Sequence, residues 1–131
     1  MIGVDTNVLV RLFVPVEPQR DAALAFFGKR SPADPAYVSL VVLAEFAWVL
    51  RRRYKYSFAR IGEGIQRVLD SDDFVVEGRD RVEWALAHYA RSKIDFSDLL
   101  IARSAATAGA RRTVTFDIDA TKYIPGMELL K

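Results

Sequence analysis

The sequence places four acidic residues at positions where a globular domain rarely leaves a carboxylate. They are Asp5, Glu45, Asp98 and Asp117. A buried carboxylate without a partner costs several kcal/mol or takes up a proton, so each acid needs either a neighbour of opposite charge or a chemical task. Clustered carboxylates without histidine or cysteine suit hard cations such as Mg²⁺ or Mn²⁺. One or two such ions can activate water and hold the oxygens of a phosphodiester.

Three of these acids also have simple structural explanations. Asp5 can cap the helix expected after it, and Asp117 can be a turn residue ahead of Asp119. Asp95 and Asp98 have the i, i+3 spacing of a capping box. Taken one at a time, these acids therefore do not require a functional site.

Glu45 is the hardest acid to explain by structure alone. It interrupts the apolar run Leu40–Leu50, in which no helix face is free of hydrophobic neighbours. We therefore expect a buried side chain, held either by an arginine or by a functional partner.

Along the chain, segments with the apolar spacing of helices alternate with short segments that have the apolar pattern of strands. Ser39 is suited to cap a helix, and Gly109 is suited to end one. Strands alternating with helices predict a parallel sheet covered on both faces. The expected strands are 1–4, which we expect to be buried, 36–39, 74–77, 112–116 and 127–129, and the expected helices are 6–13, 21–27, 40–53, 58–69, 82–90 and 97–108.

This topology predicts that the four acids meet. Ligands of open α/β sheets bind beyond the carboxyl ends of the strands, where Asp5 and Asp117 stand. Glu45 lies about one turn into the helix after the second strand, and Asp98 begins the helix that leads to the strand before Asp117. We expect one acidic cleft. The small polar residues beside the acids, which could bind water or phosphate, are Thr6, Asn7, Ser97 and Thr115.

Length and composition limit the classes of protein that fit. The 131 residues suit one domain, 1–131, and hydrophobic and charged fractions of 51% and 27% argue against disorder. The absence of cysteine excludes disulfides and zinc–thiolate sites and suits a reducing cytoplasm. No secretory signal or apolar run of about 18 residues is visible, so we expect a cytoplasmic protein without a membrane partner.

Four short motifs follow one another along the chain: Asp5-Thr6-Asn7, Glu45, Asp95-Phe96-Ser97-Asp98 and Thr115-Phe116-Asp117. In this order and at these distances they resemble the PIN-domain family and, with this length, the VapC-type ribonuclease toxins of bacterial type II toxin–antitoxin systems. The resemblance spans nearly the whole chain. It implies a three-layer α/β/α domain with a central, mostly parallel sheet.

The resemblance also implies roles for these residues. It assigns Asp5, Glu45, Asp98 and Asp117 to the acidic quartet that binds Mg²⁺ or Mn²⁺. Additional site residues are Thr6, Asp95, Thr115 and Asp119, the last of which competes with Asp117 as the fourth acid. The implied activity is cleavage of structured RNA, often transfer RNA, and the implied partners are a VapB-type antitoxin and a second copy in a homodimer. One metal ion or two remains open.

Two other functions fit parts of the sequence. Residues 114–121 match the hydrophobic-D-x-D-x-T pattern of phosphatases with an aspartate nucleophile, but too little chain follows Thr121 for the rest of such a site. A PIN-like module that binds RNA or protein without catalysis is the second alternative. Paired-histidine catalysis is excluded, because His88 is the only histidine, and we expect it on a solvated helix face.

The basic run Arg51–Arg53, with Lys55, follows the apolar part of the Glu45 helix. Such a run complements the negative end of a helix dipole. It could also follow an RNA backbone, with Tyr54 and Tyr56 available to stack on bases.

Overall fold

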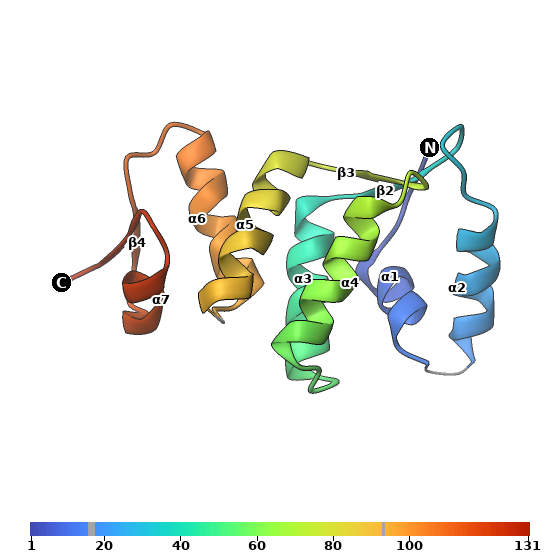
Figure 1. Cartoon of the computed structure of the whole chain (residues 1–131), viewed down its shortest axis with the longest axis horizontal. Helices are drawn as coiled ribbons and strands as arrows, with labels where there is room; N and C mark the ends of the chain where they lie inside the picture. Colours follow the sequence, from blue (N-terminus) through green and yellow to red (C-terminus); the bar gives the residue numbers. More distant parts are fainter. Residues whose placement is uncertain (16–17, 93) are drawn as a thin grey trace.

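The computed structural model describes residues 1–15, 18–92 and 94–131 and shows an α/β protein (Figure 1). The predicted alternation of strands and helices is confirmed, and helix α7 was not predicted. In chain order the elements are β1 (Ile2–Gly3), α1 (Thr6–Phe13), α2 (Gln19–Gly28), β2 (Ala36–Val38), α3 (Leu40–Arg52), α4 (Phe58–Asp70), β3 (Phe74–Val76), α5 (Arg79–Ser92), α6 (Phe96–Thr107), β4 (Thr113–Thr115), α7 (Ile118–Tyr123) and β5 (Met127–Leu129).

All strand pairs are parallel, as the sequence predicts, but the strands form two sheets instead of one central sheet. The first sheet has the order β1-β2-β3, with Ile2 opposite Ala36 and Ala36 opposite Phe74. The second sheet pairs β4 with β5, with Thr113 opposite Met127. The α/β class is therefore confirmed, while the expected single sheet is divided.

Two serine caps define the starts of the long helices α3 and α4. The Ser39 hydroxyl accepts a hydrogen bond of 3.2 Å from the Val42 amide, and the Ser57 hydroxyl accepts one of 3.2 Å from the Arg60 amide. Each bond satisfies an amide that the first helical turn leaves without a partner. The predicted cap at Ser39 is confirmed.

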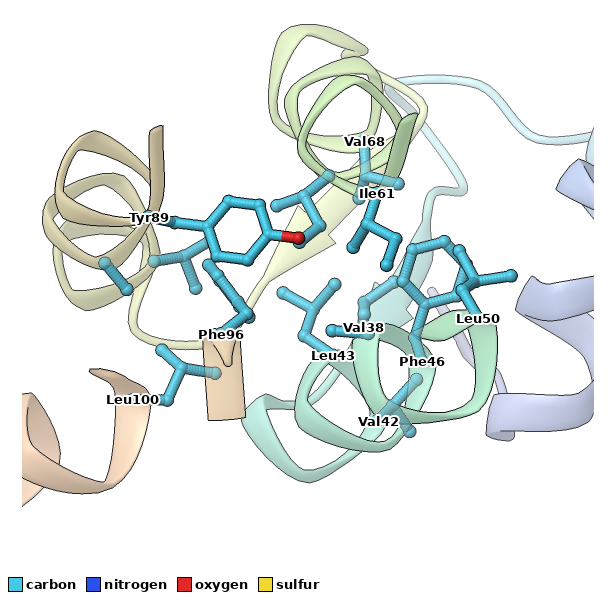
Figure 2. Packing of buried hydrophobic residues seen from close by; sticks show 14 of the residues in the cluster. Val38, Val42, Leu43, Phe46, Leu50, Ile61, Val68, Tyr89, Phe96 and Leu100 are labelled. Carbon is cyan, nitrogen blue, oxygen red and sulfur yellow. The ribbon is translucent and has the colours of Figure 1, made fainter. Parts of the chain in front are cut away.

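The hydrophobic core lies between α3, α4, α5 and α6 (Figure 2). Phe46 of α3 and Ile61 of α4 are almost completely buried, and Tyr89 of α5 and Phe96 of α6 extend the cluster to the other helices. Burial of each large side chain contributes roughly 1.5–3 kcal/mol. The core therefore anchors α6 against α3 and α5, independently of the strands that follow α6.

The segment β4-α7-β5 forms a C-terminal unit at the far end of the molecule, beyond α5 and α6 as seen from the first sheet (Figure 1). Within this unit only Ala120 and Ile124 are buried. The chain exposes 7690 Å², whereas a compact protein of this mass exposes roughly 7,000 Å². The extra surface reflects this separation.

Strand β1 is an exposed edge strand, which corrects the prediction of a buried strand over residues 1–4. Ile2 and Gly3 are exposed, and only Val4 is buried. The reason is tertiary, because β1 has β2 on one side and no described strand on the other. No helix in the described part of the chain is long and apolar enough to cross a bilayer.

Candidate active site

Asp5 and Glu45 are joined through Thr6 at the carboxyl end of β1. The Asp5 carboxylate caps α1 by accepting a hydrogen bond of 2.7 Å from the Thr6 amide. The buried Thr6 hydroxyl donates a hydrogen bond of 3.3 Å to Oε1 of Glu45. The structural explanation of Asp5 as a cap is thus correct, and the same residue belongs to an acidic pair.

Glu45 is exposed, so the prediction of a buried carboxylate is wrong. It shares one face of α3 with Val41 and Trp48, which are also exposed. The opposite face, with Leu43 and Phe46, enters the core. The apolar residues of 40–50 therefore lie on two faces of α3, one in the core and one exposed to solvent. The sequence periodicity could not show which face is exposed, because both are apolar.

Asp98 lies half-buried in the first turn of α6. Burial raises its pKa, and the nearby charges of Asp95 and Asp117 raise it further, while Arg52 acts in the opposite direction. The charge of Asp117 is among those that act on Asp98, which places Asp117 near Asp98.

Asp95 stands at the N-cap position of α6, but its side chain makes no capping hydrogen bond. Its Oδ2 instead lies 3.7 Å from Nη2 of Arg52. The capping-box explanation of Asp95 and Asp98 is therefore wrong, because the ion pair with α3 draws the Asp95 carboxylate away from the helix amides. Only the backbone bond of 3.1 Å from the Asp98 amide to the Asp95 carbonyl remains.

Asp117 caps helix α7, since its Oδ1 accepts a hydrogen bond of 3.1 Å from the Ala120 amide. The Asp117 amide in turn donates to the Thr115 hydroxyl at 3.0 Å. Asp119 is exposed in the first turn of the same helix. The interpretation of Asp117 as a turn residue missed helix α7. Asp117 itself was the available signal, because aspartate is a common N-cap residue.

The acids thus form two groups instead of one cleft. Asp5 and Glu45 meet at Thr6, and Asp98 lies near Asp95 and Asp117. Their oxygens are the donors that Mg²⁺ and Mn²⁺ prefer. Among residues 1–15, 18–92 and 94–131, however, no three His, Asp or Glu side chains lie close enough to hold a metal ion. The single chain in this conformation does not fit the expected metal site, and we derive no step through one.

A groove of about 550 Å³ lies between the end of β1 and the helices α1 and α2. Its walls come from β1, α1 and α2 and are mainly apolar, and Asp5 lies on its rim. Residues that line it include Gly3, Val4, Val8, Ala23 and Phe26.

One arginine of the basic run Arg51–Arg53 packs on an aromatic ring. The Arg51 guanidinium lies 4.4 Å from the centre of the Phe58 ring, and Arg60 covers Tyr56 at 3.9 Å. Arg60 thus covers one face of Tyr56. Arg52 and Arg53 are exposed, and the Arg53 guanidinium lies 5.6 Å from the centre of the Tyr54 ring.

His88 is half-buried and stacks on Trp84 with the ring centres 4.0 Å apart, which corrects the expected solvated position.

The parallel strands, the covering helices and the acids at the strand ends define an α/β domain with an acidic rim. Residues 2–124 match the PIN domain family, so the chain belongs to this family. PIN domains are generally metal-dependent nucleases. No curated protein shows a significant sequence match to the chain.

Proposed function

We propose that this protein is an endoribonuclease that hydrolyses RNA phosphodiester bonds. The observation that carries the proposal is the hydrogen bond of 3.3 Å that joins Thr6 to Glu45 directly beside Asp5. Two carboxylates from segments distant in sequence are held together at the carboxyl end of a strand, where α/β proteins bind their ligands. Family membership supports a nuclease.

The geometry suggests a distinct task for each acid of this pair. Thr6 holds one oxygen of Glu45, which leaves the other free to accept a proton from the attacking water. Asp5 uses Oδ1 to cap α1 and lines the groove, and no hydrogen bond from the described residues reaches its second oxygen. Asp98 and Asp117, from the second acidic group, are the other proposed site residues. The proposed cofactor is Mg²⁺ or Mn²⁺, which would supply charge neutralisation where the two groups are brought together. The expected products carry a 3′-hydroxyl and a 5′-phosphate.

The finer parts of the proposal rest on the resemblance of the four motifs. We assign the protein to the VapC-type toxins, with a VapB-type antitoxin and a homodimeric, cytoplasmic form. Structured RNA, including transfer RNA, is the proposed substrate. The exposed Arg52 and Arg53 support a polyanionic substrate, because arginine binds phosphate in a fork geometry.

The decisive experiment incubates purified protein with total RNA in Mg²⁺ or Mn²⁺ and maps the ends that form. We expect a discrete cut that disappears with EDTA and with D5N. The matched control is D72N, which removes an exposed acid in the turn before β3. If folded protein free of antitoxin cuts nothing, or if D5N cuts as well as D72N does, the nuclease proposal is wrong and the non-catalytic binding module takes its place.

The toxin role has its own test. Induced expression in a bacterial host should arrest growth, and co-expression of a small gene immediately upstream of the native one should relieve the arrest. Arrest by D5N equal to that by the wild type would contradict a nuclease toxin. Turnover of a phosphate monoester that depends on Asp117 but not on Asp5 would instead favour the phosphatase.

A further inference from the structure

Strand β1 presents an open edge. The amides of Ile2 and Val4 donate to the Pro35 and Tyr37 carbonyls of the β2 side at 3.0 and 3.1 Å. Because alternate residues of a strand direct their peptide groups to opposite sides, the peptide groups of Gly3 point to the outer edge. An unpaired strand edge is a template for another strand.

Strand β4 presents a second open edge with the complementary pattern. The Thr113 amide donates to Gly126 at 2.7 Å, and the Thr115 carbonyl accepts from Leu130 at 2.9 Å, so both face β5. The peptide groups of Val114 therefore point outward. The side chains on this unit are strongly apolar yet solvated: Val114 is 48% exposed and Phe116 is 78% exposed.

A groove that could receive β4 of another chain lies beside β1. The groove of about 550 Å³ is mainly apolar, and Gly3, Val4 and Asp5, at the end of β1, line it together with residues of α1 and α2. The chain as a whole exposes about 700 Å² more than a compact protein of its mass.

The C-terminal unit of the same chain is held away from this groove. Helix α6 is anchored by the buried Phe96 and Leu99. Its end is closed by a Schellman motif, in which the Ala110 amide donates to Ala105 at 3.0 Å and the Gly109 amide donates to Ala106 at 3.0 Å. Gly109 has φ +98°, as this cap requires. The cap directs the chain to the side away from β1 (Figure 1). A second copy can fill the groove without breaking this cap.

We propose that two copies of this chain exchange their C-terminal units, with β4 of each copy pairing in parallel with β1 of the other. The hydrogen-bond pattern permits Gly3 to stand opposite Thr115, since the Gly3 amide would then donate to the outward-facing Val114 carbonyl. The amide of Phe116, the residue directly after β4, would donate to the Gly3 carbonyl. Asp5 and Asp117 each lie two residues beyond these strand positions. The exchange therefore brings Asp117 of one copy beside Asp5 and Glu45 of the other.

The exchange explains why the described residues of a single chain form no complete acidic site. Each site would combine Asp5 and Glu45 of one chain with Asp117 of the second. This last statement rests on the proposed nuclease function, whereas the strand pairing does not.

The pairing is tested by cross-linking, since the chain contains no cysteine. In the proposed register Ile2 stands opposite Val114, and both side chains are exposed. Neighbouring strands lie about 4.8 Å apart, within reach of a disulfide. We expect an oxidised mixture of I2C and V114C to give a covalent dimer on a non-reducing gel, and each variant alone to give none. The double variant I2C/V114C should also give dimer.

A double variant that forms only an internal disulfide at monomer mass would show closure within one chain and overturn the exchange. A mixture that forms no hetero-dimer while the protein sediments as a monomer would do the same. Neither readout needs activity, so an inactive protein that forms the dimer contradicts the proposed function alone.

Activity supplies an independent check. If the wild type cleaves RNA, D5N and D117N should each be inactive. After the two are unfolded and refolded together, about a quarter of the wild-type activity should return, because half of the dimers are mixed and each holds one intact site. No recovery in a mixture shown to contain hetero-dimer would overturn the shared site.

Discussion

The Thr6 hydroxyl lies 3.3 Å from Oε1 of Glu45 and connects the start of α1 to the middle of α3. The side chain of Thr6 is buried while Glu45 is exposed, so the bond orients a solvated carboxylate from a fixed point. A donor that cannot move holds one carboxylate oxygen and leaves the other available. This relationship places Glu45 beside Asp5, although the two come from separate segments.

Replacing Thr6 by valine should separate orientation from folding. The variant T6V keeps the shape but removes the donor, so we expect a loss of about 1 kcal/mol in the free energy of unfolding. RNA cleavage should fall by about tenfold, mainly in kcat, because Glu45 loses its orientation. Urea unfolding and single-turnover cleavage measure the two effects. T6S, which restores the hydroxyl, should recover most of the activity, and a T6S enzyme as slow as T6V would contradict the orienting role.

Asp98 should make stability depend on pH in an unusual direction. Burial, Asp95 and Asp117 raise its pKa above the ordinary 3.8, so the folded chain binds this proton more tightly than the unfolded chain does. The contribution of Asp98 to stability is therefore greatest at low pH and falls as pH rises from about 3.8 through the raised pKa. D98N should remove this fall and be at least as stable as the wild type at pH 7. Its urea midpoint across pH 3.5–7 is the measurement, and unfolding of D98N at pH 7 would contradict it.

The exposed arginines after α3 should contribute to RNA affinity through charge. R52Q/R53Q removes two charges, and we expect the slope of log K against log salt to fall by about 1.4 for single-stranded RNA. The variant K29Q/R91Q removes the same charge elsewhere on the surface and serves as the control. Fluorescence anisotropy with an uncleaved RNA in EDTA gives the slopes, and equal slopes for the two variants would assign Arg52 and Arg53 no specific role.

The cap at Ser39 should contribute measurably to stability. S39A leaves the Val42 amide without its partner, at a cost of about 1 kcal/mol in the free energy of unfolding. S104A, in the last half of α6, tests an ordinary helical serine and should change stability by less than about 0.5 kcal/mol. Chemical denaturation at one pH compares the two. A loss in S39A no larger than in S104A would mean that water replaces the cap.

The local elements and the acidic motifs could be predicted well, because their signals are local. The cap at Ser39, the stop at Gly109 and the apolar spacing of residues 58–69 depend only on neighbours in the chain, and the structure confirms each. The family followed from the order of the four motifs and is confirmed. The short helix α7 was missed, since its few residues carry little periodicity.

The sequence by itself determined which residues are acidic at the ends of which strands, because strand periodicity and capping preferences act within a few residues. Only the tertiary structure decided that Glu45 is exposed, that Asp95 binds Arg52, and that β4 lies apart from β1. These outcomes depend on which faces meet across the molecule. The sequence of an apolar strand or helix face does not reveal whether the segment that packs against it belongs to the same chain or to another.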